Sequence, residues 1–146
     1  MDKIFYLKKK NYTIDWITLD SPTHQTKNEY NLIKRYANIH ICKDFKGYFN
    51  SIKCLLSKTK GIVHFHYIGW HSLFLIFANS KKNIILTPWG SDLLKNRNFI
   101  KNLWLKYTFS RSKLIICDSD RLKTESIKLG ANKKNFLLSM FGVEIN

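Results

Sequence analysis

The sequence predicts an α/β protein with a Rossmann-like parallel sheet flanked by helices. Short apolar runs rich in β-branched residues alternate with segments of helical periodicity along the 146 residues. Strands that alternate with helices of this length are typical of βαβ units, whose strands run parallel. The middle runs are apolar without polar alternation, as in strands covered on both faces. Together these patterns indicate one domain with its own core.

The elements follow from the runs in order. The expected strands span Thr13–Leu19, Ile39–Cys42, Gly61–Phe65, Asn83–Thr87, Lys113–Cys117 and Asn135–Leu138. The expected helices span Asn28–Ala37, Gly47–Ser57, Trp70–Asn79, Arg97–Ser110 and Arg121–Leu129. The last helix has clear end signals, because Ser119 or Asp120 can cap its first turn and Gly130 can end it.

The composition limits the classes of function and the compartment. Lys and Arg number 25 against 10 Asp and Glu, so the formal charge is +15, which suits a polyanionic partner or is simply a solvated, lysine-rich surface. The 3 cysteines are odd in number and lack metal-binding spacing, which favours reduced structural thiols and a cytoplasmic protein without a metal site. The N-terminus lacks the apolar region of a secretory signal, and no apolar stretch has the length of a membrane span.

A turn after the fourth expected strand is the best candidate for a binding site. Thr87–Asp92 reads Thr-Pro-Trp-Gly-Ser-Asp, in which Pro88 ends the strand and Gly90 permits a tight or left-handed backbone. Ligands of open α/β sheets bind at the carboxyl ends of the strands. We therefore expect the loops at Tyr67–Trp70, Pro88–Asp92 and Asp118–Asp120 to lie on one edge of the sheet.

The order of these segments, closed by Phe141-Gly142-Val143-Glu144, resembles the N-terminal, acceptor-side domain of family-4 glycosyltransferases with the GT-B fold. The resemblance implies a retaining hexosyltransferase that uses a nucleotide-sugar donor and no other cofactor or metal. It also implies a sugar or lipid-linked sugar acceptor, in cell-surface polysaccharide or glycolipid synthesis. Family members that act on lipid-linked acceptors associate with membranes, so peripheral contact with the anionic inner face of the plasma membrane is expected.

The resemblance covers only part of the family pattern. Family members open with a strand and a Gly-rich loop, whereas here no glycine precedes Gly47. Residues 1–146 are therefore expected to be a partial N-terminal domain without its first strand and Gly-rich loop. The sheet then either has a gap or pairs Thr13–Leu19 directly with Gly61–Phe65. The donor-binding C-terminal domain is expected to be absent, and the isolated chain to be inactive.

The candidate substrate-binding residues are His66, Trp89, Gly90, Ser91, Asp92 and Ser119. His66 is a candidate because it ends a strand, where a histidine is more often a hydrogen-bonded structural group, and the resemblance indicates the others, although Ser119 can equally be a cap. Trp89 stands where many members have His, so no general base is carried over, and the catalytic residues remain unassigned. An indole ring can instead stack against a sugar. Asp92 can accept hydrogen bonds from sugar hydroxyls or cap the next helix. His64 and His66 share a face, but a third metal ligand near them is lacking in the sequence.

Two further alternatives remain open. The segment Arg97–Lys113 predicts a basic amphipathic helix, with Phe99, Ile100, Leu103, Trp104 and Tyr107 as an apolar stripe. A core-facing stripe is the preferred interpretation, and a membrane-facing stripe is the alternative. For the whole chain, the alternative function is a basic nucleic-acid-binding α/β module without enzymatic activity, although the sequence has no nucleic-acid-binding motif and its basic residues are dispersed. Half of a sugar-nucleotide epimerase is a third, less favoured interpretation.

Overall fold

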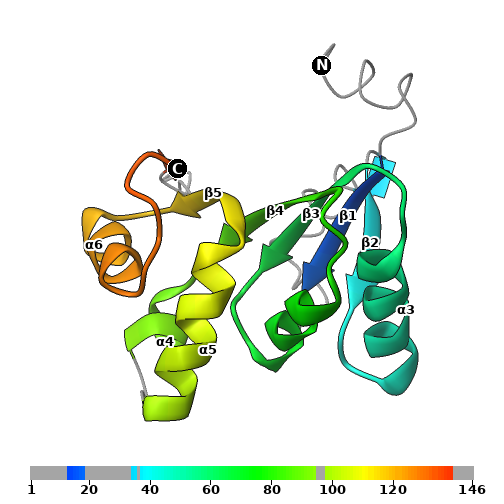
Figure 1. Cartoon of the computed structure of the whole chain (residues 1–146), viewed down its shortest axis with the longest axis horizontal. Coiled ribbons are helices and arrows are strands. Elements are labelled where there is room, and N and C mark those ends of the chain that lie inside the picture. Colours follow the sequence, from blue (N-terminus) through cyan, green and yellow to red (C-terminus); the bar gives the residue numbers. More distant parts are fainter. Residues whose placement is uncertain (1–12, 19–33, 36, 95–97, 140–146) are drawn as a thin grey trace, which may run out of the picture.

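The computed structural model describes residues 13–18, 34, 35, 37–94 and 98–139, without the side chain of Asp92. Its centre is a 6-stranded parallel sheet in the order β2-β1-β3-β4-β5-β6, with helices packed against it (Figure 1). This confirms the predicted fold class, a Rossmann-like α/β arrangement that matches one half of a GT-B fold.

The strands agree with the expected runs to within one residue at either end. They are β1 (Thr13–Thr18), β2 (Asn38–Ile41), β3 (Gly61–His66), β4 (Lys82–Thr87), β5 (Ser112–Cys117) and β6 (Phe136–Leu138). The helices are α3 (Phe45–Leu56), the 3₁₀ helix η2 (Trp70–Phe77), α4 (Gly90–Leu94), α5 (Phe99–Ser110) and α6 (Asp120–Lys128). The expected helix at Asn28–Ala37 lies mostly outside the described residues, as does Phe141–Glu144.

Two elements differ from the expectation. The helix after β3 is a 3₁₀ helix, in which the backbone N–H of Ser72 donates to the Gly69 carbonyl oxygen over 2.9 Å. Its three-residue repeat places Ser72 and Leu75 on one face, and both are fully buried. The helix α4 was not expected, because five residues are too few to show a helical period.

The strand β1 lies between β2 and β3 without a break. Its Asp15 pairs with Asn38 of β2, while Trp16 pairs with His64 of β3. Of the two expected outcomes, a gapped sheet or direct pairing of Thr13–Leu19 with Gly61–Phe65, the structure shows the second. The strand β1 is thus the second strand of the sheet, between the edge strand β2 and β3.

The direction of the chain through the sheet reverses at β1. The chain steps from β1 to β2 on one side, returns past β1 to β3, and then moves outward through β4 and β5 to β6. The returning crossovers all step the same way, so their usual right-handedness puts them on one face of the sheet. Ligands of open α/β sheets bind at the carboxyl ends of the strands beside such a reversal, which here are the ends of β1 and β3.

The core lies on the face covered by α3, η2 and α5. Alternate strand residues point into it, and they are at most 1% exposed: Ile17, Val63, Phe65, Ile84 and Leu86. The residues between them on β1 and β3, including Trp16, His64 and His66, are only partly buried. The burial therefore alternates along β3, whose two histidines both lie on the partly buried face.

Candidate functional site

The three loops predicted to share an edge do so. Tyr67 follows β3, Trp89 follows β4 and Ser119 follows β5, and these strands run parallel. The backbone N–H of Tyr67 donates to the Thr87 carbonyl oxygen over 3.1 Å, which ties the first loop to the second. The carboxyl edge next to the chain reversal therefore carries the predicted segments.

Four rings gather here, and we call them the aromatic cluster: Trp16 of β1, His66 at the end of β3, and Tyr67 and Trp89 in the loops after β3 and β4. The ring centroid of His66 lies 5.2 Å from that of Trp16 and 5.7 Å from that of Trp89. Tyr67 and Trp89 stack 5.2 Å apart with an interplanar angle of 18°. The predicted residues His66 and Trp89 are thus brought together, with Trp16 and Tyr67 added by the fold.

His64, two residues before His66 on β3, contacts the aromatic cluster through Trp16. Its Nε2 atom lies 2.7 Å from the Thr87 hydroxyl, and its ring lies 4.5 Å from that of Trp16. Burial, helped by the nearby His66, lowers the pKa of His64 to about 3. The imidazole is therefore neutral at physiological pH, and its hydrogen bond fixes the carboxyl end of β4 beside the cluster.

Tyr67 has an uncommon backbone conformation. Its φ angle is 71°, in the left-handed region that side chains other than glycine rarely adopt. This conformation costs of the order of 1 kcal/mol and is kept only where neighbouring contacts hold it. Sequence reasoning did not single out Tyr67, and its only signal is an aromatic residue between His66 and Gly69.

The predicted turn at Trp89–Asp92 is in fact the start of a helix. The helix α4 begins at Gly90, and the backbone N–H of Leu93 donates to the Trp89 carbonyl oxygen over 3.4 Å. Asp92 therefore lies within α4 and does not directly precede a helix. Of the two backbone conformations considered for Gly90, tight or left-handed, the left-handed one is not adopted, because Gly130 is the glycine with positive φ among the described residues. Ser91 is exposed beside them.

Ser119 acts as a helix cap in this structure. Its hydroxyl accepts a hydrogen bond from the backbone N–H of Leu122 over 3.4 Å, so it caps α6 as the sequence indicated. Gly130, with a φ of 89°, ends the same helix region as expected. A direct contact of Ser119 with substrate remains a prediction.

The apolar stripe of α5 is divided between the core and the surface. Phe99 is 77% exposed, Ile100 71% and Leu103 52%, whereas Trp104 packs against the core and Tyr107 donates a hydrogen bond to η2. The preferred interpretation, a core-facing stripe, therefore holds only for Trp104 and Tyr107. Leu105 and Phe109, which are not part of the stripe, are buried.

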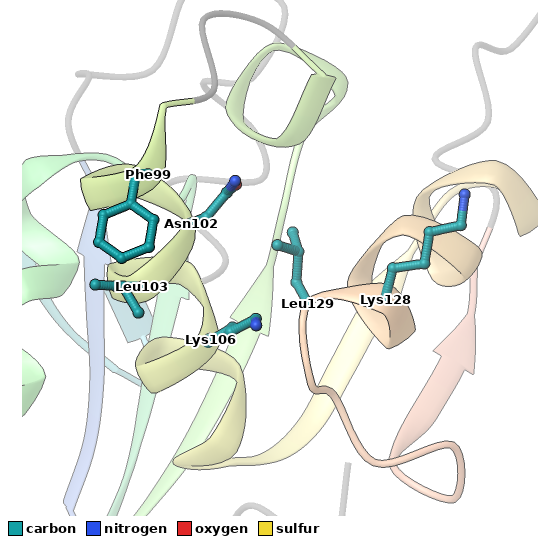
Figure 2. A pocket seen from close by; sticks show the side chains of 6 residues that line it. All are labelled: Phe99, Asn102, Leu103, Lys106, Lys128 and Leu129. Carbon is teal, nitrogen blue, oxygen red and sulfur yellow. The ribbon is translucent and has the colours of Figure 1, made fainter.

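An open groove runs between α5 and the end of α6. Its volume is about 280 Å³, and Figure 2 shows the side chains that line it: Phe99, Asn102, Leu103, Lys106, Lys128 and Leu129. The Lys128 ammonium group pairs with the Glu125 carboxylate at 2.8 Å. The groove thus joins the exposed apolar stripe to two basic side chains.

The comparisons with known proteins identify one family. The family described as glycosyl transferase 4-like matches residues 2–119, which include β1 to β5 and the aromatic cluster. None of the curated proteins matches the chain. In the part of the chain that the structure describes, no helix is both long and apolar enough to cross a membrane.

Proposed function

Because this chain belongs to the glycosyl transferase 4-like family, we propose that it is the acceptor-side domain of a retaining hexosyltransferase that uses a nucleotide-sugar donor. The aromatic cluster beside the chain reversal is the observation that carries the proposal. Indole and phenol rings offer flat apolar surfaces that suit the faces of sugar rings. A family-typical route is the assembly of a cell-surface polysaccharide or glycolipid.

The proposed contribution of this domain is to position the acceptor. In the transfer, an acceptor hydroxyl oxygen bonds to the anomeric carbon of the donor, the bond from that carbon to the nucleoside diphosphate breaks, and the hydroxyl proton passes to the departing diphosphate. Trp89 cannot take that proton, since an indole N–H is only a donor. The imidazole of His66 can hydrogen-bond an acceptor hydroxyl, and Ser91 and Asp92 on α4 are the further proposed contacts. Holding the reacting groups in place lowers the entropic part of the barrier.

The proposal assigns donor binding to a further domain, so the isolated chain is expected to bind an acceptor without transferring sugar. Saturation-transfer difference NMR tests this with methyl hexosides, methyl N-acetylhexosaminides and a short-chain polyprenyl-diphosphate sugar. Saturation of ring protons by the native chain, lost in His66→Ala, is the expected result. Equal signals from native and variant protein would contradict the site. Turnover of a nucleotide sugar by the chain alone would contradict the assignment of donor binding to a further domain.

We also propose that the stripe of α5 rests on an anionic membrane. Phe99, Ile100 and Leu103 are exposed, with Lys101 and Lys106 on the same helix and a formal charge of +15 on the chain. Each basic residue near an anionic leaflet contributes about 1 kcal/mol, while inserted apolar side chains add burial. Such contact brings the aromatic cluster near a lipid-linked acceptor.

Co-sedimentation with vesicles tests the membrane proposal. Binding to vesicles with anionic phosphatidylglycerol and not to pure phosphatidylcholine is expected. Phe99→Ser should weaken it several-fold, whereas Phe45→Ser on α3, which replaces a phenylalanine that is 85% exposed, should not. An equal loss of vesicle binding in both variants would contradict the proposed role of α5. Tight, steeply salt-dependent oligonucleotide binding without vesicle binding would instead favour the nucleic-acid module.

A further inference from the structure

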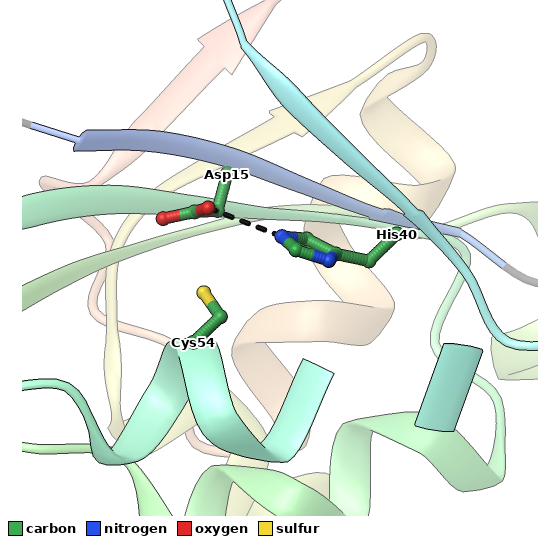
Figure 3. A group of neighbouring side chains, drawn as sticks. All are labelled: Asp15, His40 and Cys54. Atoms are coloured by element: carbon green, nitrogen blue, oxygen red, sulfur yellow. Dashed lines mark hydrogen bonds and ion pairs between the residues drawn. The ribbon is translucent and has the colours of Figure 1, made fainter. Parts of the chain in front are cut away.

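Three potential metal ligands from three separate elements meet on the helix-covered face of the sheet. They are Asp15 of β1, His40 of β2 and Cys54 of α3, and their ligand atoms all lie within 4.8 Å of one another. Figure 3 shows the carboxylate, the imidazole and the thiol directed toward a common point. This group lies on the opposite face of the sheet from Trp16, so it is separate from the aromatic cluster.

The carboxylate of Asp15 is held in place by neighbours. Its Oδ1 atom lies 3.1 Å from His40 Nε2 and accepts a hydrogen bond from Asn38 Nδ2 over 3.1 Å. Its Oδ2 atom lies 4.0 Å from the Lys82 ammonium group. Burial alone would raise the pKa of Asp15, but the hydrogen bonds from His40, Asn38 and Cys54 outweigh it and lower the pKa to about 2. The group is therefore an anion in a buried position.

The thiol of Cys54 reaches the other two groups from α3, and its Sγ atom lies within 4.8 Å of the ligand atoms of Asp15 and His40. A divalent metal binds cysteine as the thiolate, because the metal–sulfur bond replaces the S–H bond.

We propose that Asp15 Oδ1, His40 Nε2 and Cys54 Sγ form a binding site for a zinc ion. Zinc prefers sulfur, imidazole nitrogen and carboxylate oxygen in tetrahedral geometry, with bonds of about 2.0–2.3 Å that place ligand atoms roughly 3–4 Å apart. Asp15 Oδ1 and His40 Nε2, 3.1 Å apart, already meet this, and the Cys54 Sγ atom lies within 4.8 Å of both. A water molecule completes the fourth position.

The charges and protons balance in this site. Zinc displaces the thiol proton to solvent, while the imidazole proton moves from Nε2 to Nδ1 and stays on the ring. The carboxylate and the thiolate together cancel the two positive charges of the ion, and Lys82 remains the neighbouring cation. Asn38 and Lys82 keep their contacts with Asp15 and so orient the ligand, as outer partners of metal sites do. The ion would fasten α3 to β1 and β2.

The alternative is that the three side chains form a hydrogen-bonded group without a metal. Binding of Co²⁺, which substitutes for zinc and absorbs visible light, distinguishes the two possibilities. Purified chain is stripped with a chelator, then titrated with Co²⁺ and followed by absorption spectroscopy. One equivalent should give the sulfur-to-cobalt charge-transfer band and the visible bands of tetrahedral cobalt, and zinc should abolish both. Absence of saturable binding, or a spectrum of octahedral cobalt without sulfur, would overturn the proposal.

Matched variants locate the site. Cys54→Ser should remove the charge-transfer band and weaken zinc binding by about a hundredfold or more. Cys117→Ser, which changes a buried thiol at the end of β5, should leave both unchanged. Should Cys54→Ser not fold, His40→Gln decides, because His40 is only partly buried. An unaltered cobalt spectrum in His40→Gln would place the metal elsewhere and contradict the proposal.

Discussion

The ring of Tyr67 stacks on that of Trp89 at 5.2 Å, and Tyr67 holds a left-handed backbone to do so. The contact joins the carboxyl ends of β3 and β4, since Tyr67 directly follows the first and Trp89 lies just beyond the second. The stack and the hydrogen bond from the Tyr67 N–H to Thr87 together offset the strain. The edge of the sheet beside the chain reversal is thus preorganised by contacts within the aromatic cluster.

The strained backbone at Tyr67 predicts that a glycine variant is more stable than an alanine variant, the reverse of the usual order. Both Tyr67→Ala and Tyr67→Gly remove the stack, but only glycine adopts a φ of 71° without steric cost. Tyr67→Gly is therefore expected to be about 1 kcal/mol more stable than Tyr67→Ala, as measured by urea unfolding. At ordinary positions glycine is the less stable of the two, so an alanine variant of equal or greater stability would refute the strained conformation.

Two neutral histidines predict sensitivity to mild acid. Burial lowers the pKa of His64 to about 3 and that of His71 to about 4, against about 6.5 in an unfolded chain. The unfolded state then binds more protons below pH 6.5, so the free energy of unfolding falls as the pH falls. His64 keeps some exposed surface, which reduces its share, and we expect a loss of about 2 kcal/mol between pH 7.5 and 5.5.

Urea unfolding across that range checks the acid effect, with a His64→Gln, His71→Leu double variant as the comparison. The variant should lose less stability over the same interval, since neither replacement titrates there. Parallel pH profiles for the two proteins would show that other groups cause the dependence. A native protein equally stable at both pH values would contradict the buried, neutral state of these rings.

Replacement of Gly47 and of Gly90 by alanine should change the stability of the protein by different amounts. A Cβ atom on Gly47 would collide with the backbone carbonyl of Ile41, whereas the nearest atom to a Cβ on Gly90 is Leu94 Cδ1 at 3.8 Å. Gly47→Ala should therefore cost several kcal/mol by forcing α3 away from the end of β2, while Gly90→Ala should change stability by less than about 1 kcal/mol. Thermal unfolding of both variants tests this. Equal effects would mean that α3 does not approach β2 as closely as the structure shows.

The strands of the sheet could be predicted from the sequence, because buried parallel strands need continuous apolar runs. The run at Asn83–Thr87 and the Pro88-Trp89-Gly90 segment after it placed β4 and its carboxyl end almost to the residue. The common edge of the three loops followed from strand direction alone. Local pattern and global topology agree in this part of the chain, which is why the prediction is confirmed.

The rest depends on contacts between residues far apart in the chain. Asp15 and His40 are 25 residues apart, and only the pairing of β1 with β2 brings them together. The exposure of Phe99 on α5 also depends on the fold, since periodicity cannot tell which apolar side of a helix is covered. The helix α4 was missed for a related reason, because five residues are too few to show a helical period.

The role of the aromatic cluster in acceptor binding is tested most directly by the affinity of Trp89→Ala. Isothermal titration calorimetry uses the acceptor probe that gives the strongest NMR signal with the native chain. Trp70→Ala is the matched control, because Trp70 lies on η2, is 71% exposed and stacks on Trp104. We predict that Trp89→Ala weakens binding about tenfold, equal to about 1.4 kcal/mol, and that Trp70→Ala leaves it unchanged. Unchanged affinity in a folded Trp89→Ala variant, or equal losses in both variants, would contradict the account.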